Sequence, residues 1–411
     1  MSVNFRKATL DNGLTIIAEV DPHAYTTAAG FWISTGARDE KPELMGVSHF
    51  LEHMMFKGSS NRSAEEVNRD FDDLGAINNA FTSAEMTAYW IHLLPEFLES
   101  GVRILADILR PSLRQEDFDS EKQVILEEIA MYEDQPFWVL YEHAMSRFYG
   151  DHPLAHRVLG TRETVGGMQR DLMNDYFQAR YSSDNITLAI AGAVDFDAMV
   201  SLVEDTCGQW KPSNPIRTHP KIDLARDRST LKLPGLNQAY LLMLSEAPPA
   251  ESLDRYAAGM AAHTLGGSEG SRLYWSLVET GLAEEAQSSY DGRDGAGEFA
   301  TWAVCTPDSI TKVEDLIHSE IDSLSSNVEQ GDVDRARARI ATAAALAAEK
   351  PLGRMNRMAA TWIRRKEYLS IEDEMKHIDA IEVDQVRVCA EKYPLRPKVV
   401  SIAVGEGVEI G

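Results

Sequence analysis

Residues 49–53 read His49-Phe50-Leu51-Glu52-His53, within a segment, residues 47–57, that contains neither proline nor glycine. On an α-helix, residues i and i+4 share one face, so His49 and His53 can direct their imidazole nitrogens at one cation. Two histidines at this spacing are a common zinc pair. Glu52 lies at the edge of the same face, within reach of a water molecule on that cation. Taken alone, the five residues would equally fit two ordinary histidines of a surface or a core.

The order His-x-x-Glu-His is the reverse of His-Glu-x-x-His and is the signature of inverted zincins. A catalytic zinc needs a third protein ligand and an open position. Glu121 and Glu128 are seven residues apart, two turns along one face of a helix. One of these carboxylates can bind the metal while the other holds a ligand histidine through its second ring nitrogen. Glu127, about 100° round the helix from Glu128, is the fallback.

Two stretches of the chain read alike, one near its midpoint and one at its end. Residues 173–194 contain a helix and then a strand that ends at Gly192, and residues 383–405 contain a helix and then a strand that ends at Gly405. Residues 211–220 hold three prolines and little periodicity, as is typical of a linker. We therefore predict an α+β protein of two similar halves, residues 1–211 and 223–411, joined by a linker at 212–222.

The first half carries recognisable signals for its strands and helices. Asn12-Gly13 is a hairpin turn between β-rich runs. Ser63, with Glu66 three residues later, predicts a capping box at the start of a helix, and Gly75 is its expected stop. The other expected elements are strands at 26–34, 77–81 and 86–93, and helices at 42–57, 96–109 and 115–132.

Composition excludes several classes of protein. The 411 residues carry a formal charge of −25, which argues against nucleic acid, because phosphate contacts need clustered Lys and Arg. No run approaches the roughly 18 apolar residues of a membrane span. The first residues show no secretory signal, so we expect a cytoplasmic protein of the soluble bacterial type. The three cysteines are far apart and predict neither disulfides nor a thiolate metal site.

Several motifs, read in order, are similar to those of the pitrilysin/insulinase peptidases, which include the mitochondrial processing peptidase. Residues 46–58 closely resemble the active-site helix of that family, and residues 121–128 resemble its distal ligand segment. The remaining similar segments are Gly75–Tyr89, His152-Pro153-Leu154, Gly160-Thr161 and, in the second half, Gly270-Ser271-Arg272-Leu273-Tyr274. The resemblance covers the whole first half and continues more weakly into the second.

The resemblance implies a zinc metalloendopeptidase and assigns a role to each matching residue. His49, His53 and Glu128 would bind one zinc ion per chain, with Glu121 in support. Glu52 would be the catalytic base that takes a proton from the zinc-bound water. The strand Asn79, Ala80, Phe81, Thr82 would offer an edge to which an extended peptide adds. Each half would be a mainly antiparallel sheet packed with helices, and the two would enclose a clam-like chamber.

One segment departs from the family pattern. In most members of the family, an Arg and then a Tyr come after the Ser-Arg-Leu segment, and both contact the substrate. Here those positions are occupied by Val278 and by Glu284 or Glu285. Arg272 is better suited to a structural role at the start of a helix. We therefore expect either a homodimer or a heterodimer with a related subunit that carries the Arg/Tyr pair.

Two other functions remain open. The chain could be a non-catalytic scaffold subunit of the same family, although such members usually lose zinc ligands. It could also be a peptide-binding member that captures extended chains on the Asn79–Thr82 edge without cutting them. Serine or cysteine nucleophile chemistry is not indicated, because no Gly-x-Ser-x-Gly elbow is present and the cysteines lack motif context.

Overall fold

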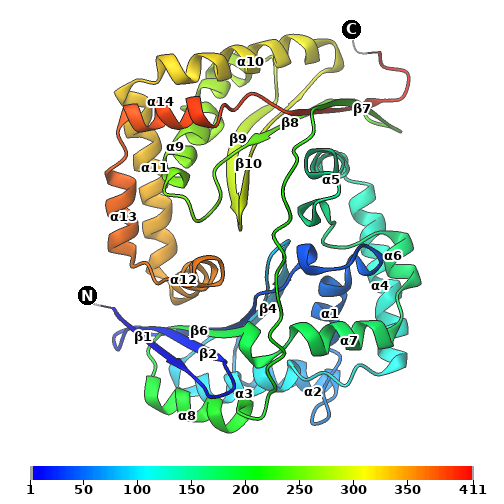
Figure 1. Cartoon of the computed structure of the whole chain (residues 1–411), viewed down its shortest axis with the longest axis vertical. Coiled ribbons are helices and arrows are strands. Elements are labelled where there is room, and N and C mark those ends of the chain that lie inside the picture. Colours follow the sequence, from blue (N-terminus) through cyan, green and yellow to red (C-terminus); the bar gives the residue numbers. More distant parts are fainter. Residues whose placement is uncertain (1–2, 410–411) are drawn as a thin grey trace. The chain divides into compact units, whose positions relative to one another are not determined.

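The computed structural model of the chain describes residues 3–409, which form two compact units (Figure 1). The first unit runs to Ala130 and adds His156–Thr218 and Leu346–Leu369. The second unit comprises Met131–Ala155, His219–Ala345 and the chain from Ser370 onward.

The first unit is built on a six-stranded sheet. Its strands lie in the order β1-β2-β6-β3-β5-β4, so β4 forms one edge. The β2–β6 pair is parallel, and the other pairs are antiparallel. The strands are β1 (Asn4–Thr9), β2 (Thr15–Val20), β3 (Thr27–Ile33), β4 (Ile77–Thr82), β5 (Thr87–Leu93) and β6 (Ile186–Gly192).

Helices cover both faces of this sheet, because β3 is apolar on both sides. Phe31 and Ile33 face the larger core, whereas Trp32 faces a second cluster together with Trp362. The helices of the first unit are α1 (Val47–Met55), α2 (Ala64–Asp73), α3 (Leu98–Ile108), α4 (Gln115–Glu133, which runs past Ala130), α6 (Arg162–Gly167), α7 (Arg170–Arg180), α8 (Phe196–Cys207) and α12 (Pro351–Arg365). The predicted capping box is present, since Ser63 and Glu66 each accept a hydrogen bond from the backbone N–H of the other.

The second unit contains a five-stranded sheet in the order β7-β11-β8-β10-β9. Its strands are β7 (Asp227–Leu233), β8 (Ala239–Glu246), β9 (Glu285–Arg293), β10 (Ala296–Cys305) and β11 (Val399–Gly405). Its helices are α5 (Pro136–Tyr149), α9 (Asp254–Gly266), α10 (Ile310–Asn327), α11 (Gln330–Glu349, which runs past Ala345 into the first unit), α13 (Ile371–Asp379) and α14 (Val383–Lys392), with a π-helix at Tyr274–Val278.

Apart from β1, which has no counterpart in the second sheet, the two sheets share one strand order. In the first, β6 runs parallel to β2 and antiparallel to β3. In the second, β11 runs parallel to β7 and antiparallel to β8. These central strands are the two whose sequences read alike, at Gly192 and Gly405. The prediction of an α+β protein with two similar halves is therefore confirmed.

The compact units differ from the contiguous halves, residues 1–211 and 223–411, that the sequence suggested. Helix α5 comes from the first half of the sequence but packs on β8 and β11 of the second unit. Helix α12 comes from the second half but packs on β3 and β6 of the first (Figure 1). Each helix covers an apolar sheet face that would otherwise meet water. The assignment of contiguous halves as folding domains stays a prediction.

The predicted linker, residues 212–222, contains neither helix nor strand, and the boundary between the units falls inside it, after Thr218. Its first part is fastened to the first unit. The Arg217 guanidinium donates to the Asp39 carboxylate at 2.7 Å and to the Glu85 carbonyl oxygen at 2.5 Å. The anchored part of the linker therefore extends at least to Arg217.

Replacing Trp362 of α12 by Ala is expected to lower the free energy of unfolding by about 3–5 kcal/mol, because the ring is 7% exposed against the sheet of the first unit. Urea denaturation measures the change. Trp275, which is 59% exposed, provides the matched control, and its replacement by Ala should change stability by less than about 0.5 kcal/mol. Equal effects of the two substitutions would contradict the packing of α12 on this sheet.

Candidate metal centre

Helix α1 begins at Val47, later than the predicted start at Pro42. The segment Pro42–Leu44 is a separate 3-10 turn, and Gly46 adopts a left-handed conformation with φ of +94°. A Cβ at Gly46 would lie 2.6 Å from the Leu159 carbonyl oxygen, so only glycine fits there. The prediction of one helix over 42–57 was wrong, because the close contact of Gly46 with a distant loop interrupts the helix at that residue.

A buried carboxyl group caps the start of α1. The two oxygens of Glu40 accept hydrogen bonds from the backbone N–H groups of Gly46 and Ser48, each at 2.7 Å. Burial raises the pKa of the Glu40 carboxyl to about 8, although both backbone hydrogen bonds oppose the rise. These bonds satisfy N–H groups that a helix N-terminus leaves without partners. Glu40 thus helps to hold the first turn of the helix that carries His49.

The structure brings His49, His53 and Glu128 together. One ligand atom from each lies within 4.8 Å of the others, and no other three His, Cys, Asp or Glu residues between residues 3 and 409 come together in this way. The Glu128 Oε2 atom is 3.8 Å from His49 Nε2 and 3.7 Å from His53 Nε2. Helices α1 and α4 meet here, and their contact includes a stacked pair, Phe50 and Phe118, with ring centroids 4.7 Å apart.

These distances fit a cation. They are too long for hydrogen bonds, yet two ligand atoms on a tetrahedral zinc, with bonds of about 2.1 Å, stand about 3.4 Å apart. Burial lowers the pKa of His49 to about 3, and the neighbouring charge of His53 adds to the effect. His49 is therefore neutral near pH 7, which is the form that binds metal. The donor set of two imidazoles and one carboxylate suits zinc.

Of the two adjacent glutamates, Glu128 faces the histidines and Glu127 is exposed to solvent. The helix positions them about 100° apart, so only one can point at α1. The alternative that Glu127 completes the triad is therefore not supported.

Glu121 lies behind His53. The Glu121 Oε1 atom is 2.8 Å from His53 Nδ1, and Lys57 places its ammonium 2.5 Å from Glu121 Oε2. Burial opposes ionisation of Glu121, but the hydrogen bonds from His53 and Lys57 outweigh it and hold the pKa of this carboxyl below its ordinary value. A charged Glu121 favours the His53 tautomer with hydrogen on Nδ1, which leaves Nε2 for a metal.

Replacing Glu121 by Ala is expected to weaken zinc binding by about 10- to 100-fold, because His53 loses the partner that sets its orientation. Glu121→Gln should fall between wild type and Glu121→Ala, since an amide oxygen still accepts the Nδ1–H bond. Competition with a zinc indicator measures both. Glu116→Ala changes an exposed residue of the same helix and serves as the control. An unchanged zinc affinity in Glu121→Ala would show that Glu121 does not orient His53 for metal binding.

Glu52 is half-buried beside this group. Its Oε2 accepts a hydrogen bond from the Thr82 hydroxyl at 2.6 Å. Burial raises the pKa of the Glu52 carboxyl, while the Thr82 hydroxyl and the charge of His53 act in the opposite direction. A raised pKa suits a group that must both take and return a proton near neutral pH.

The remaining predicted residues occupy defined positions. Asn79, Ala80, Phe81 and Thr82 all belong to the edge strand β4, which packs against α1. Val278 ends the π-helix of the second unit, and Glu284 accepts a hydrogen bond from Gln238 at 2.6 Å. Arg272 donates to Ser323 and to the Asn327 carbonyl oxygen, which supports the structural role expected for it.

Sequence reasoning missed two side chains around the site, and for Thr82, a predicted residue of the edge strand, it missed the contact with Glu52. Glu40 caps α1, Lys57 pairs with Glu121, and the hydroxyl of Thr82 binds Glu52. Only Lys57 had a local signal, since it lies one helical turn after His53. The other two depend on contacts between separate segments.

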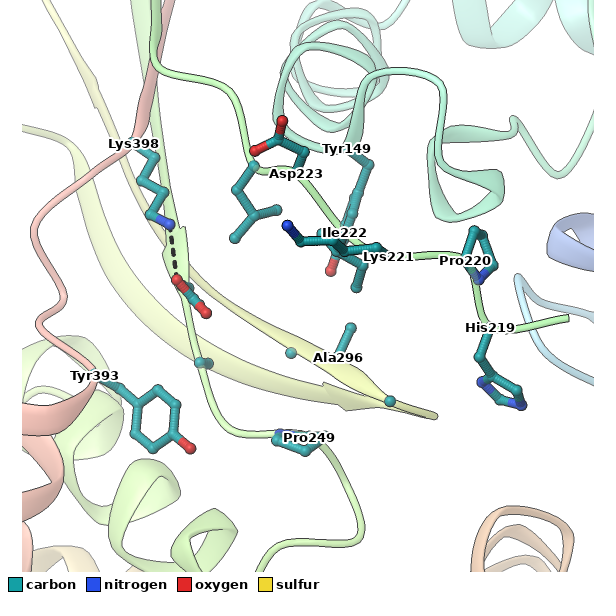
Figure 2. Close-up of a pocket in the computed structure, with 15 residues that line it drawn as sticks. Tyr149, His219, Pro220, Lys221, Ile222, Asp223, Pro249, Ala296, Tyr393 and Lys398 are labelled. Carbon is teal, nitrogen blue, oxygen red and sulfur yellow. Dashed lines mark hydrogen bonds and ion pairs between the residues drawn. The ribbon is translucent and has the colours of Figure 1, made fainter.

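A separate cavity of about 490 Å³ lies in the second unit (Figure 2). Residues His219–Leu224, which comprise the end of the linker and the two residues after it, form one wall, and a Lys398–Glu246 ion pair of 2.7 Å lies in another. The cavity contains none of the predicted site residues.

None of the described helices is long and apolar enough to cross a membrane.

The fold and the site define an α+β protein with a candidate zinc centre of the inverted zincin pattern. The family model for insulinase (peptidase family M16) matches residues 15–162, and the model for the peptidase M16 inactive domain matches residues 167–340. The chain belongs to this family. The second match agrees with α9, which follows β8 as α1 follows β3 but lacks the His-x-x-Glu-His motif.

Curated relatives and solved structures agree with this assignment. The chain is 30% identical over 393 residues to an uncharacterized zinc protease of Mycobacterium leprae, covering 94% of this chain and 88% of that protein. It is 28% identical over 390 residues to the uncharacterized zinc protease YmxG of Bacillus subtilis, covering 94% and 95%. A protease structure from Helicobacter pylori has the same fold, with a TM-score of 0.91, 18% identity and coverage of 98% and 99%.

Proposed function

We propose that this chain is a zinc-dependent endopeptidase that hydrolyses peptides or unfolded segments. The observation that carries the proposal is the convergence of His49, His53 and Glu128 beside Glu52. Membership of a family whose relatives are called zinc proteases supports it.

Each residue of the site has its own role in the proposed reaction. His49, His53 and Glu128 would hold one zinc ion, and Glu121 would hold His53 in its metal-binding tautomer. When bound, zinc supplies a Lewis acid that polarises the peptide carbonyl and acidifies water. Glu52 takes the proton of the attacking water and delivers it to the leaving amine. A half-buried carboxylate with a raised pKa suits both steps.

We place the substrate along β4. This strand is the edge of its sheet, so its outer backbone groups can pair with an extended peptide. The Asn79 side chain accepts a hydrogen bond from the Ala80 N–H at 2.8 Å, and an incoming peptide that uses this N–H would displace the side chain. Backbone pairing would let the enzyme bind many sequences.

We also propose that the enzyme works as a dimer, either of this chain or with a related subunit that carries the Arg/Tyr pair. Val278, and Glu284 or Glu285, cannot provide the cationic and phenolic contacts expected at their positions, which favours a related subunit as the partner. The cytoplasmic location stays a prediction.

Zinc analysis and a peptide-cleavage assay test the proposed function. The purified chain should bind about one zinc ion and cut an unstructured basic peptide at internal bonds. A well-folded protein that binds no zinc would support the scaffold alternative. A zinc-loaded protein that binds the peptide without cutting it, even with every co-purifying chain present, would support the binding-only alternative.

The mass of co-purifying chains, followed by cleavage with and without a candidate partner, tests the dimer proposal. Activity that requires the related subunit would support the heterodimer. Full activity of this chain alone would refute it and leave the homodimer.

A further inference from the structure

The end of the edge strand β4 touches the candidate base directly. Thr82 is the last residue of β4, and its hydroxyl donates to Glu52 Oε2 at 2.6 Å. Glu52 lies on α1, 30 residues earlier in the chain. The distance is that of a short hydrogen bond between a hydroxyl and a carboxylate, which is about twice as strong as a bond between neutral groups.

The alternation of side chains along β4 explains why Thr82 faces α1. Phe81 packs edge-on against Trp32, with ring centroids 5.5 Å apart, on the sheet face covered by α12. Ala80 packs into the core on the opposite face, to which α1 belongs. Successive strand residues point to opposite faces, so Thr82 shares the face of Ala80. The register of β4 with β5, in which Thr82 pairs with Thr87, holds this arrangement.

We propose that Thr82 is a positioning residue that orients the Glu52 carboxylate and couples it to the peptide-binding edge. The proposal rests on the proposed function of the site. The last torsion of a glutamate side chain has a broad preference, so an unanchored carboxylate can turn. The Thr82 bond holds Oε2 and leaves Oε1 for the proton of the attacking water. The strand that would pair with the substrate backbone therefore also holds the base.

A purely structural role is the competing interpretation. Glu52 and Thr82 are both half-buried, and a threonine could simply supply a partner for a carboxylate that burial would otherwise penalise. That role would show itself in stability and zinc content. A positioning role would show itself in kcat, with the KM for peptide nearly unchanged, because the backbone of β4 remains intact.

Three substitutions separate these interpretations in the zinc-loaded, full-length protein. Thr82→Val keeps the shape and strand preference of threonine but removes the hydroxyl, Thr82→Ala is a second variant without a hydroxyl, and Thr82→Ser keeps the hydroxyl. Each variant is checked for zinc content and melting temperature. The kcat and KM are then measured with an unstructured fluorogenic peptide.

We expect Thr82→Val and Thr82→Ala to lower kcat by about 10- to 100-fold, with KM within about twofold of wild type. We expect Thr82→Ser to recover kcat to within about threefold of wild type. Wild-type kcat in Thr82→Val would overturn the proposal. So would a loss in Thr82→Ser as large as that in Thr82→Val.

Crystal structures of wild type and Thr82→Val give a readout that does not depend on activity. A Glu52 carboxylate that leaves its wild-type orientation in Thr82→Val supports the positioning role, and an unchanged orientation overturns it. If zinc-loaded wild type cuts no peptide even with every co-purifying chain present, the proposed function fails, and this comparison still decides whether Thr82 orients Glu52.

Discussion

Glu52→Gln is expected to lower kcat for peptide hydrolysis by about 10²–10⁴-fold, because a glutamine cannot take the proton of the attacking water. Zinc should remain bound, since Glu52 is not among the three residues whose ligand atoms converge. The amide keeps the size of the side chain and can still accept the Thr82 hydrogen bond through its oxygen. Steady-state kinetics and metal analysis on the same sample measure the two quantities.

Glu127→Gln is the matched control for this substitution. It changes the same chemical group on an exposed residue of the neighbouring helix α4, and its kcat should equal that of wild type. Hydrolysis by Glu52→Gln at more than about a tenth of the wild-type rate would show that another group acts as the base.

Glu128→Gln should weaken zinc binding by more than about 100-fold, which exceeds the effect expected for outer partners such as Glu121, and activity should fall with it. A charged carboxylate opposite two neutral imidazoles contributes strongly to binding of a divalent cation, and an amide oxygen does not replace its charge. Equilibrium dialysis against a zinc chelator measures the affinity. Excess zinc in the assay should restore part of the lost activity.

Glu127→Gln again provides the comparison, because the two glutamates are adjacent in sequence and differ only in the direction in which they point. Its zinc affinity should match that of wild type. If Glu127→Gln lost zinc and Glu128→Gln kept it, the arrangement of α4 against α1 would have to be different from the one described.

Local sequence signals predicted most of the elements that surround the site. The Ser63–Glu66 capping box, the strand at residues 77–81 and the helix that carries Glu121 and Glu128 follow from patterns within a few residues. The likeness of residues 173–194 and 383–405 predicted two similar halves, and β6 and β11 occupy equivalent positions in their sheets. The predicted start of α1 was wrong, because the loop at Leu159 packs closely against Gly46. No residue near Gly46 in the sequence signals that contact.

These local signals could not predict that α5 packs on the sheet of the second unit and α12 on the sheet of the first. Both helices begin with a proline, at Pro136 and Pro351, and both are amphipathic, but neither sequence says which sheet its apolar face will cover. That choice depends on which face is left open once the strands have paired. In the first unit, Trp32 and Ala28 belong to an apolar face of the sheet, and α12 covers that face.

The sequence by itself determined the spacing of His49, Glu52 and His53 on one helix, because helical periodicity needs no distant partner. It also placed Glu121 and Glu128 on one face of a second helix. The family resemblance predicted Glu128 as the third ligand and Glu121 in support, and the tertiary structure brings Glu128 to both histidines and Glu121 to His53. Only the tertiary structure decided that Thr82 binds Glu52. The physical reason is that each of these contacts joins segments far apart in the chain. Their meeting is set by how helices and strands pack, not by the residues beside them.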